Sequence, residues 1–422
     1  MHKVALGIGA LLAAASAAIA DEPRDIRRVE QALQAVIARA EPAVACLYVY
    51  RPDHADSFRA PTAAEGVPDY YASGVVVESG RILTNYHFIR EAAGEGDPTH
   101  VRFRTRLPAR KDAAGNDGAP RQAIATLFAA DAKSDLAVLR YDEPRGRTPT
   151  IPLGRGEDLK KGSFVVSLAH PYAAGYRDGS PSASTGIVSN LRRRQVTNGS
   201  ETDRAKLPLR HFATLVQTDV RLQLGTSGGA LLDLDGKLVG LTTAAAALTG
   251  VDAPGGFAIP MDEAMRRIVE VLVRGDEVEY GFLGINTNQD PDRRLPPGEG
   301  VMISRVVGNT PAADFLRPGD VILKINGRTL GEYDDLFLQL ATTLAGRKAA
   351  LLIRRGPVER TVDVPLVKVP VEVDRTTHRL KDEFAVIAMN KPRDFYGLRV
   401  DYTSLLAKET MSLPPGVLVR EA

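Results

Sequence analysis

The composition is that of a globular chain with almost balanced charge. The chain has 422 residues, of which 44% are hydrophobic and 25% are charged, and this is typical of two or three folded domains. Lys and Arg number 54 against 52 Asp and Glu, so the formal net charge is only +2. Such a balance excludes recruitment of nucleic acid or an anionic membrane by a global electrostatic field, and we expect no nucleic-acid partner.

The first twenty residues, 1–20, are typical of a secretory signal peptide. A short basic start precedes an apolar run from residue 4 to residue 20, and Ala18 and Ala20 form an Ala-x-Ala cleavage site. A membrane anchor is the alternative, but it needs about 20 apolar residues with flanking charge. We expect cleavage after Ala20, a periplasmic or otherwise extracytoplasmic mature protein, and no integral membrane segment after cleavage.

A helix followed by many short strands is predicted for the next 240 or so residues. Apolar residues recur at helical spacing over residues 29–40, and Glu41-Pro42 ends that pattern. Short β-branched runs then extend from residue 44 to about residue 261, the clearest at 74–77, 81–84, 136–139, 164–167 and 237–241. Many short strands with few helices predict an all-β barrel or sandwich.

Two long polar inserts, residues 51–71 and 191–211, interrupt the β pattern. Loops of this length in compact domains are usually functional or disordered. The second insert carries Arg192, Arg193 and Arg194 and is our candidate for a sensor loop. The single cysteine, Cys46, allows no intramolecular disulfide, and its apolar run 43–48 indicates a buried small hydrophobe rather than a nucleophile.

A second unit follows the β-rich region. Residues 262–272 have the apolar periodicity of a helix, and Arg274-Gly275-Asp276 ends it, so we place a domain boundary there. Strand-like runs at 280–285, 300–303 and 321–325, with a helical stretch at 334–344, predict a small mixed domain. Residues 396–400 and 413–417 echo 280–284 and 295–298, which indicates an internal repeat that stops before a complete copy, either truncated or vestigial.

A serine between glycines is the strongest chemical motif. In Gly225-Thr226-Ser227-Gly228-Gly229, the N–H groups of Gly225 and Ser227 could converge on a developing oxyanion, and glycine permits positive φ without a side chain in the approach path. A plain glycine-rich turn is the alternative. A serine hydroxyl also needs a general base and a group that fixes the tautomer of that base.

His87 and Asp135 are the candidates for those two roles. His87 lies where the apolar strand 82–84 ends, and Asp135 directly precedes the buried strand 136–139, where an unpaired carboxylate would be costly. Asp131 is a competing candidate for the catalytic carboxylate, and the alternative role of Asp135 is to cap the turn. The order His, Asp, Ser within one β-rich region is that of chymotrypsin-like enzymes.

These motifs together resemble the HtrA family of protein-quality-control serine proteases. The resemblance is carried by 84–87, 135–139, 217–219, 225–229 and 255–260. It implies a mainly β fold, in which a chymotrypsin-like double β-barrel is followed by a small α/β PDZ-like domain and an incomplete second PDZ-like repeat. It also implies a triad between the barrels, assembly into homo-oligomers built from trimers, and loops that switch the oxyanion hole. We expect a signal peptide at 1–20, a protease domain at 21–275, a PDZ domain at 278–368, and a linker with a truncated repeat at 369–422.

The PDZ expectation depends on residues 280–285 and 317–322. A peptide would add a strand at an exposed sheet edge while backbone N–H groups capture its terminal carboxylate. Phe282, Leu283, Gly284 and Ile285 are therefore candidate groove residues for peptide C-termini. Their alternative is the core of a small β domain.

Several residues depart from the pattern of the family. Thr226 replaces the commoner Asn, Leu224 and Ala230 stand where Pro is frequent, and His170-Pro171 replaces Asn-Pro. These changes bear on how readily the oxyanion hole forms without an activating ligand. Leu222 and Leu224 could form an apolar S1 wall.

The sequence motifs predict two alternative functions. The first is a cofactor-independent serine endopeptidase that cleaves unfolded or damaged exported polypeptides, and the alternative is a peptide-binding sensor or chaperone with weak or silent proteolysis. We predict no catalytic metal, because the remaining histidines show no ligand spacing with Cys or carboxylates; they are His54, His100, His170, His211 and His378.

Overall fold

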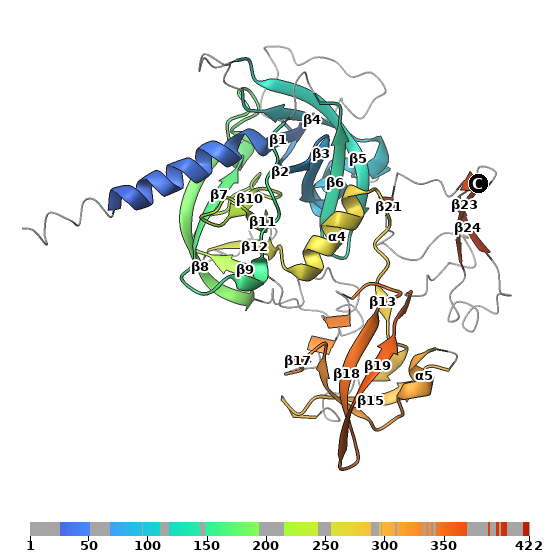
Figure 1. Cartoon of the computed structure of the whole chain (residues 1–422). Helices are drawn as coiled ribbons and strands as arrows, with labels where there is room; N and C mark the ends of the chain where they lie inside the picture. The colour runs from blue at the N-terminus through green and yellow to red at the C-terminus, as the bar shows by residue number, and fades with distance from the viewer. Residues whose placement is uncertain are drawn as a thin grey trace, which may run out of the picture.

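The computed structural model describes most of the chain from residue 26 onward (Figure 1). The described residues are 26–50, 68–94, 96–109, 118–143, 148–193, 215–243, 255–287, 295–296, 298–308, 310–331, 335–336, 339–340, 343–368, 387–388, 394–395, 398–402 and 417–421. The predicted signal peptide, most of both polar inserts and most of the tail after residue 368 lie outside them. None of the described helices has the length and apolar content needed to cross a membrane.

The first barrel contains six strands and closes through a pairing of β5 with β6. The strands run in the order β5-β4-β1-β2-β3-β6, and the short β21 (Ile387–Ala388) adds outside β5. Their bounds are β1 (Val44–Val49), β2 (Tyr70–Glu78), β3 (Arg81–Asn85), β4 (Arg102–Leu107), β5 (Arg121–Asp131) and β6 (Leu136–Tyr141).

Strand β1 shows why these apolar runs form a barrel wall. Successive side chains of a strand point to opposite faces. Leu47 and Val49 therefore lie in the main apolar core, whereas Cys46 and Tyr48 pack with Ala173 of the second barrel. Cys46 is buried as predicted, and burial raises the pKa of its thiol far above the ordinary value.

The second barrel is also closed, in the order β10-β11-β12-β9-β8-β7. Its strands are β7 (Phe164–Ala169), β8 (Ser182–Arg193), β9 (Leu215–Thr218), β10 (Ala230–Leu232), β11 (Leu238–Thr243) and β12 (Gly256–Pro260). The predicted strands at 164–167 and 237–241 correspond to β7 and β11. The expected double barrel is confirmed.

Helices are few in the described part of the chain. A helix at residues 26–40 precedes the first barrel, α2 (Tyr86–Ala93) follows β3, and α4 (Glu263–Val273) follows the second barrel. The 3-10 turns are η1 (Glu41–Ala43), η3 (Pro98–His100), η4 (Gly156–Asp158) and η5 (Pro171–Ala173). The helices predicted at 29–40 and 262–272 are confirmed.

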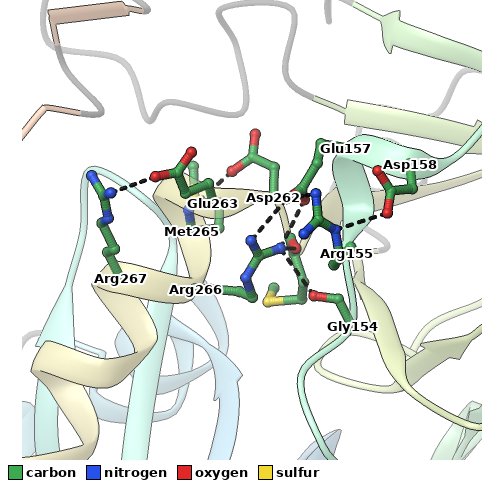
Figure 2. Close-up of polar contacts among 10 residues, drawn as sticks. Gly154, Arg155, Glu157, Asp158, Asp262, Glu263, Met265, Arg266 and Arg267 are labelled. Atoms are coloured by element: carbon green, nitrogen blue, oxygen red, sulfur yellow. Dashed lines mark hydrogen bonds and ion pairs between the residues drawn. The ribbon is translucent and has the colours of Figure 1, made fainter.

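The start of α4 is fixed by capping and by one arginine (Figure 2). Asp262 caps the helix by accepting a hydrogen bond from the Met265 N–H at 3.0 Å. Arg266 donates to both carboxylate oxygens of Glu157 at 2.7 and 2.8 Å, and to the carbonyls of Met261 and Gly154 at 2.9 and 3.0 Å. These bonds hold the pKa of Glu157 below its usual value and tie α4 to the second barrel.

The second unit is a small β domain with its own apolar core. Its sheet has the order β14-β15-β16-β18-β19, with β17 paired to β16 and with β13 paired to β20 separately. The elements are β13 (Gly281–Phe282), β14 (Ile285–Thr287), β15 (Val301–Val306), α5 (Ala312–Phe315), β16 (Val321–Ile325), β17 (Arg328–Thr329), β18 (Lys348–Arg355), β19 (Val358–Pro365) and β20 (Val367–Lys368). Of the predicted helix at 334–344, the described residues 335–336 and 339–340 are helical.

Three short strands lie near the end of the chain. They are β22 (Asp394–Phe395), β23 (Leu398–Tyr402) and β24 (Val417–Glu421), and they form a separate antiparallel sheet. An antiparallel pairing of β23 with β24 parallels that of β14 with β15 in the small domain. The incomplete repeat stays a prediction.

Candidate active site

Two of the predicted site residues come from neighbouring strand ends in the first barrel. Asn85 is the N-cap of α2, which places His87 in the first turn of that helix. Asp135 precedes β6, which pairs with β3 through Asn85 and Leu136. The Nδ1 atom of His87 lies 2.9 Å from Oδ2 and 3.1 Å from Oδ1 of Asp135. A neutral imidazole that donates from Nδ1 to this carboxylate keeps Nε2 as a proton acceptor.

Asp135 adopts a left-handed backbone conformation with φ of 59°. Aspartate tolerates this region better than most residues, at a cost of about 1 kcal/mol. The conformation lets the Asp135 carbonyl accept from the Tyr86 N–H at 3.0 Å and from Asn85 Nδ2 at 3.2 Å. The carboxylate also accepts from the backbone N–H of His87 at 2.9 Å, so it is buried and aimed at the imidazole before any substrate binds.

Ser227 comes from the second barrel, between β9 and β10. Its Oγ lies 3.1 Å from Nε2 of His87. The serine is 7% exposed and the imidazole is 15% exposed, so both can be reached from solvent while being held by packing. The structure therefore brings His87, Asp135 and Ser227 into one hydrogen-bonded chain across the two barrels.

The competing carboxylate, Asp131, has different partners. Its Oδ2 accepts hydrogen bonds from the Ser134 N–H at 2.9 Å and from the hydroxyl of Tyr280. Asp131 is fully buried, and burial raises the pKa of its carboxyl group. Asp135 is thus the carboxylate bonded to His87, and Asp131 supports the turn before it.

The peptide that joins Leu224 to Gly225 has a defined orientation. The Leu224 carbonyl accepts from the Tyr172 N–H at 2.7 Å, and a trans peptide directs the Gly225 N–H the opposite way. Within the described chain this N–H makes no hydrogen bond, which leaves it available to an oxyanion. Gly225 has φ of 91°, and a Cβ there would lie 2.6 Å from the His170 carbonyl oxygen. Glycine is therefore required at this position, because φ is positive and because a Cβ would clash with the His170 carbonyl.

Ser73 is a site residue that the sequence did not single out. It lies on β2, fully buried, and its N–H donates to the Ser227 carbonyl at 2.8 Å. Its hydroxyl donates to the Gly225 carbonyl at 2.7 Å and accepts from the His170 N–H at 2.8 Å. The only signal in the sequence is one hydroxyl residue within the otherwise apolar run 72–77.

The polar atoms of Thr226 are paired within the turn before Ser227. Its Oγ1 donates to the Gln223 carbonyl at 2.6 Å, and its N–H donates to the same carbonyl at 3.1 Å. Its own carbonyl accepts from Thr242 Oγ1 at 2.5 Å. Hydrogen bonds to Gln223 and from Thr242 therefore stabilise the turn before Ser227.

The two leucines predicted for the substrate pocket have different surroundings. Leu222 is half-buried against the second barrel, where a Cβ on Gly256 would lie 2.6 Å from its Cγ. Leu224 is 41% exposed. Residues 244–254, which lie between β11 and β12 in the chain, are outside the described residues.

The four candidate groove residues also differ in their surroundings. Leu283 is 2% exposed and belongs to the core of the small domain, whereas Ile285 is half-buried on β14. Phe282 pairs with Val367 through β13, and the Gly284 carbonyl accepts from the Val307 N–H at 2.8 Å. Among the described strands, β14 is at one edge of its sheet.

The described residues offer no candidate metal centre. In the part of the chain that the structure describes, no three His, Cys, Asp or Glu side chains gather into a potential metal site. His170 is fully buried behind the Ser227 loop, and His100 lies on η3. The other histidines named above, His54, His211 and His378, lie outside the described residues.

Comparison with known proteins identifies two domains. A family model of the trypsin-like peptidase domain matches residues 72–241, and a model of the PDZ domain matches residues 272–354. The periplasmic pH-dependent serine endoprotease DegQ of Escherichia coli is 30% identical over 392 residues, which cover 86% of this chain and 77% of DegQ. A probable periplasmic serine endoprotease, DegP-like, from Hahella chejuensis is 30% identical over 304 residues, covering 71% of this chain and 57% of the relative.

Comparison with solved structures also finds similarity to HtrA-type proteases. The structure described as HtrA-type protease AlgW with decapeptide is 26% identical to this chain, with a TM-score of 0.53. The match covers 80% of this chain and 99% of that chain. The likeness therefore includes both the barrels and the domain that follows them.

Proposed function

Because the chain belongs to the family of HtrA-type serine proteases, we propose that it is a periplasmic serine endopeptidase that cleaves unfolded or damaged exported polypeptides. The observation that carries the proposal is the continuous contact from Asp135 through His87 to Ser227, at 2.9 and 3.1 Å. An otherwise weak hydroxyl nucleophile becomes reactive only when such a base is within hydrogen-bond distance.

The proposed mechanism assigns one role to each residue. Ser227 Oγ attacks the scissile carbonyl while His87 Nε2 accepts its proton, and Asp135 stabilises the imidazolium that forms. His87 then protonates the leaving amine, and water hydrolyses the acyl-enzyme by the reverse proton transfers. The N–H groups of Gly225 and Ser227 stabilise the oxyanion, and such donors are typically worth about 3 kcal/mol each.

Leu222 and Leu224 support a preference for small or medium apolar residues before the scissile bond. Leu222 contributes a half-buried apolar surface beside Gly256, and Leu224 contributes an exposed one. We assign Leu222 to the wall of the S1 pocket and Leu224 to its rim. A Leu222→Asp variant would lower kcat/KM for apolar peptides and spare those with a basic residue at the same position.

The PDZ domain is proposed to bind peptide C-termini along β14. The edge position of this strand supports it, because an edge strand presents unpaired backbone groups to an incoming strand. Phe282 to Ile285 would form the groove and the carboxylate loop, with Leu283 contributing from the core side. Fluorescence anisotropy with one peptide as free acid and as amide tests this, since only the free acid should bind tightly.

The domain limits and the assembly belong to the same proposal. We place the signal peptide at 1–20, the protease at 21–275, the PDZ domain at 278–368, and a linker with a partial repeat at 369–422. A separate apolar cluster with members from Leu283 to Leu366 supports the PDZ limits. We also propose a homo-oligomer built from trimers, and sedimentation velocity of the mature protein would give a monomer mass if this is wrong.

Hydrolysis of an unfolded casein tests the proposed function. The parent should cleave casein and take up one fluorophosphonate at Ser227, and Ser227→Ala should do neither. Ser163→Ala, which removes another serine hydroxyl from the second barrel, is the matched control and should keep full activity. A casein-cleavage rate for Ser227→Ala equal to that of the parent would exclude the mechanism.

A further inference from the structure

We propose that Tyr280 and Asp131 are positioning residues of the catalytic site, acting on the turn that carries Asp135. Tyr280 follows the protease barrels in the chain and leads into the PDZ domain, so a residue outside the barrels completes their active site. The inference rests on the proposed function and adds to it a structural requirement for the segment after α4.

Asp131 holds the turn that ends at Asp135. Its carboxylate Oδ2 accepts from the Ser134 N–H at 2.9 Å, and its backbone carbonyl accepts from Ser134 Oγ at 3.4 Å. The turn closes where the Asp135 N–H donates to the Ala132 carbonyl at 3.3 Å. These contacts fix the residue immediately before Asp135, which must stay in its left-handed conformation to face His87.

The Asp131 carboxylate depends on Tyr280 because it has few other donors. Asp131 is 0% exposed, and its Oδ1 makes no hydrogen bond within the described chain. Besides Ser134, the Tyr280 hydroxyl supplies a hydrogen bond to Oδ2. A buried carboxylate that loses one of its few donors is strongly penalised, and it relieves the penalty by moving toward solvent or taking up a proton.

Tyr280 is anchored on both sides of the domain boundary. Its side chain is 7% exposed within the main apolar core of the protease barrels, and the ammonium of Lys133 lies 4.3 Å from its ring centre. Its backbone belongs to the small domain, because Tyr280 bridges to Leu344 and the next N–H, that of Gly281, donates to the Thr343 carbonyl at 2.8 Å. The hydroxyl is thus held in place by two packed domains.

The test compares Tyr280→Phe with Tyr141→Phe on a short peptide substrate with an apolar residue before the scissile bond. Tyr141 is a matched control, since it is 3% exposed on β6 and its hydroxyl contacts Glu143 at 3.4 Å, away from the Asp135 turn. Active sites are counted with a fluorophosphonate, so that kcat refers to folded enzyme only. Thermal unfolding is recorded for each variant.

We expect Tyr280→Phe to lower kcat per titrated site about tenfold, with KM changed by less than about twofold. Tyr141→Phe should keep the parent kcat. Asp131→Asn should also lower kcat, and adding Tyr280→Phe to it should cost little more, because the tyrosine acts through that carboxylate.

The outcomes separate the inference from the proposed function. A parent protein that neither cleaves the peptide nor reacts with the fluorophosphonate would overturn the function itself. An active parent with parent-like kcat per titrated site in Tyr280→Phe would overturn only the inference, even if the melting temperature fell. Equal losses from Tyr280→Phe with and without Asp131→Asn would overturn it too.

Discussion

Replacing His170 should make the protein less sensitive to acid. His170 directly precedes η5, is fully buried, and gives its backbone N–H to Ser73 Oγ at 2.8 Å. Burial lowers the pKa of its imidazole from 6.5 to about 4, and the Val44 backbone and the charge of Asp178 offset this only in part. Asparagine is polar, as histidine is, and carries no titrating group.

The size and sign of the effect follow from the two pKa values. In the unfolded chain the imidazole binds a proton below about pH 6.5, whereas in the folded protein it stays neutral down to about pH 4. Between these values the unfolded state binds more protons, so the free energy of unfolding falls as pH falls. The pKa of the imidazole is about 2.5 lower in the folded protein than in the unfolded chain. The free energy of unfolding therefore falls by about 3 kcal/mol between pH 6.5 and pH 4.

Urea unfolding at a series of pH values measures this slope. Tyrosine fluorescence reports on the transition, since the chain has 12 Tyr and no Trp, and a Ser227→Ala background prevents self-digestion. From pH 6.5 to pH 4 the parent should lose about 3 kcal/mol more than His170→Asn. His100→Asn, at an exposed position on η3, should retain the slope of the parent. Parallel slopes for the parent and His170→Asn would refute the reasoning.

Three further substitutions follow from contacts described above. Ser73→Ala leaves two buried backbone groups unpaired behind the Ser227 loop, and steady-state kinetics should show kcat about tenfold lower with KM little changed. Arg266→Ala should lower the free energy of unfolding by about 2 kcal/mol, whereas Arg267→Ala, which removes an exposed pair within α4, should cost under about 0.5 kcal/mol in the same urea titration. Asp320→Ala removes the two 2.6 Å bonds from Arg355 and should destabilise the PDZ domain by about 3 kcal/mol in calorimetry, while kcat for a short peptide stays that of the parent.

Residues that follow local rules were predictable from the sequence. Strand β6 contains a continuous apolar run because it is buried on both faces, in the barrel interior and beside α4, and α4 shows both its cap at Asp262 and its apolar periodicity. The three candidate catalytic residues could be named because each lies beside a strand end with a recognisable neighbourhood. Their meeting in space, 48 and 140 residues apart, required the coordinates.

The supporting residues were not predictable, for a physical reason. Ser73 and Tyr280 form hydrogen bonds to partners 152 and 149 residues away. Apart from the single hydroxyl in the apolar run 72–77, nothing in the local sequence distinguishes them from packing residues. Asp131 was singled out only as a rival to Asp135, because a buried carboxylate has the same local sequence signature whether its partner is an imidazole or a phenol. The roles of these three residues can be assigned only from their tertiary contacts.

The bond between the Ser73 N–H and the Ser227 carbonyl has a consequence for biogenesis. The imidazole belongs to the half of the protease synthesised first, and the nucleophile belongs to the half synthesised later. Each half alone lacks part of the triad, so a chain of which only the first half has been synthesised cannot hydrolyse a peptide bond. The catalytic triad forms only when the two barrels pack together, so peptide hydrolysis requires the complete folded protease domain.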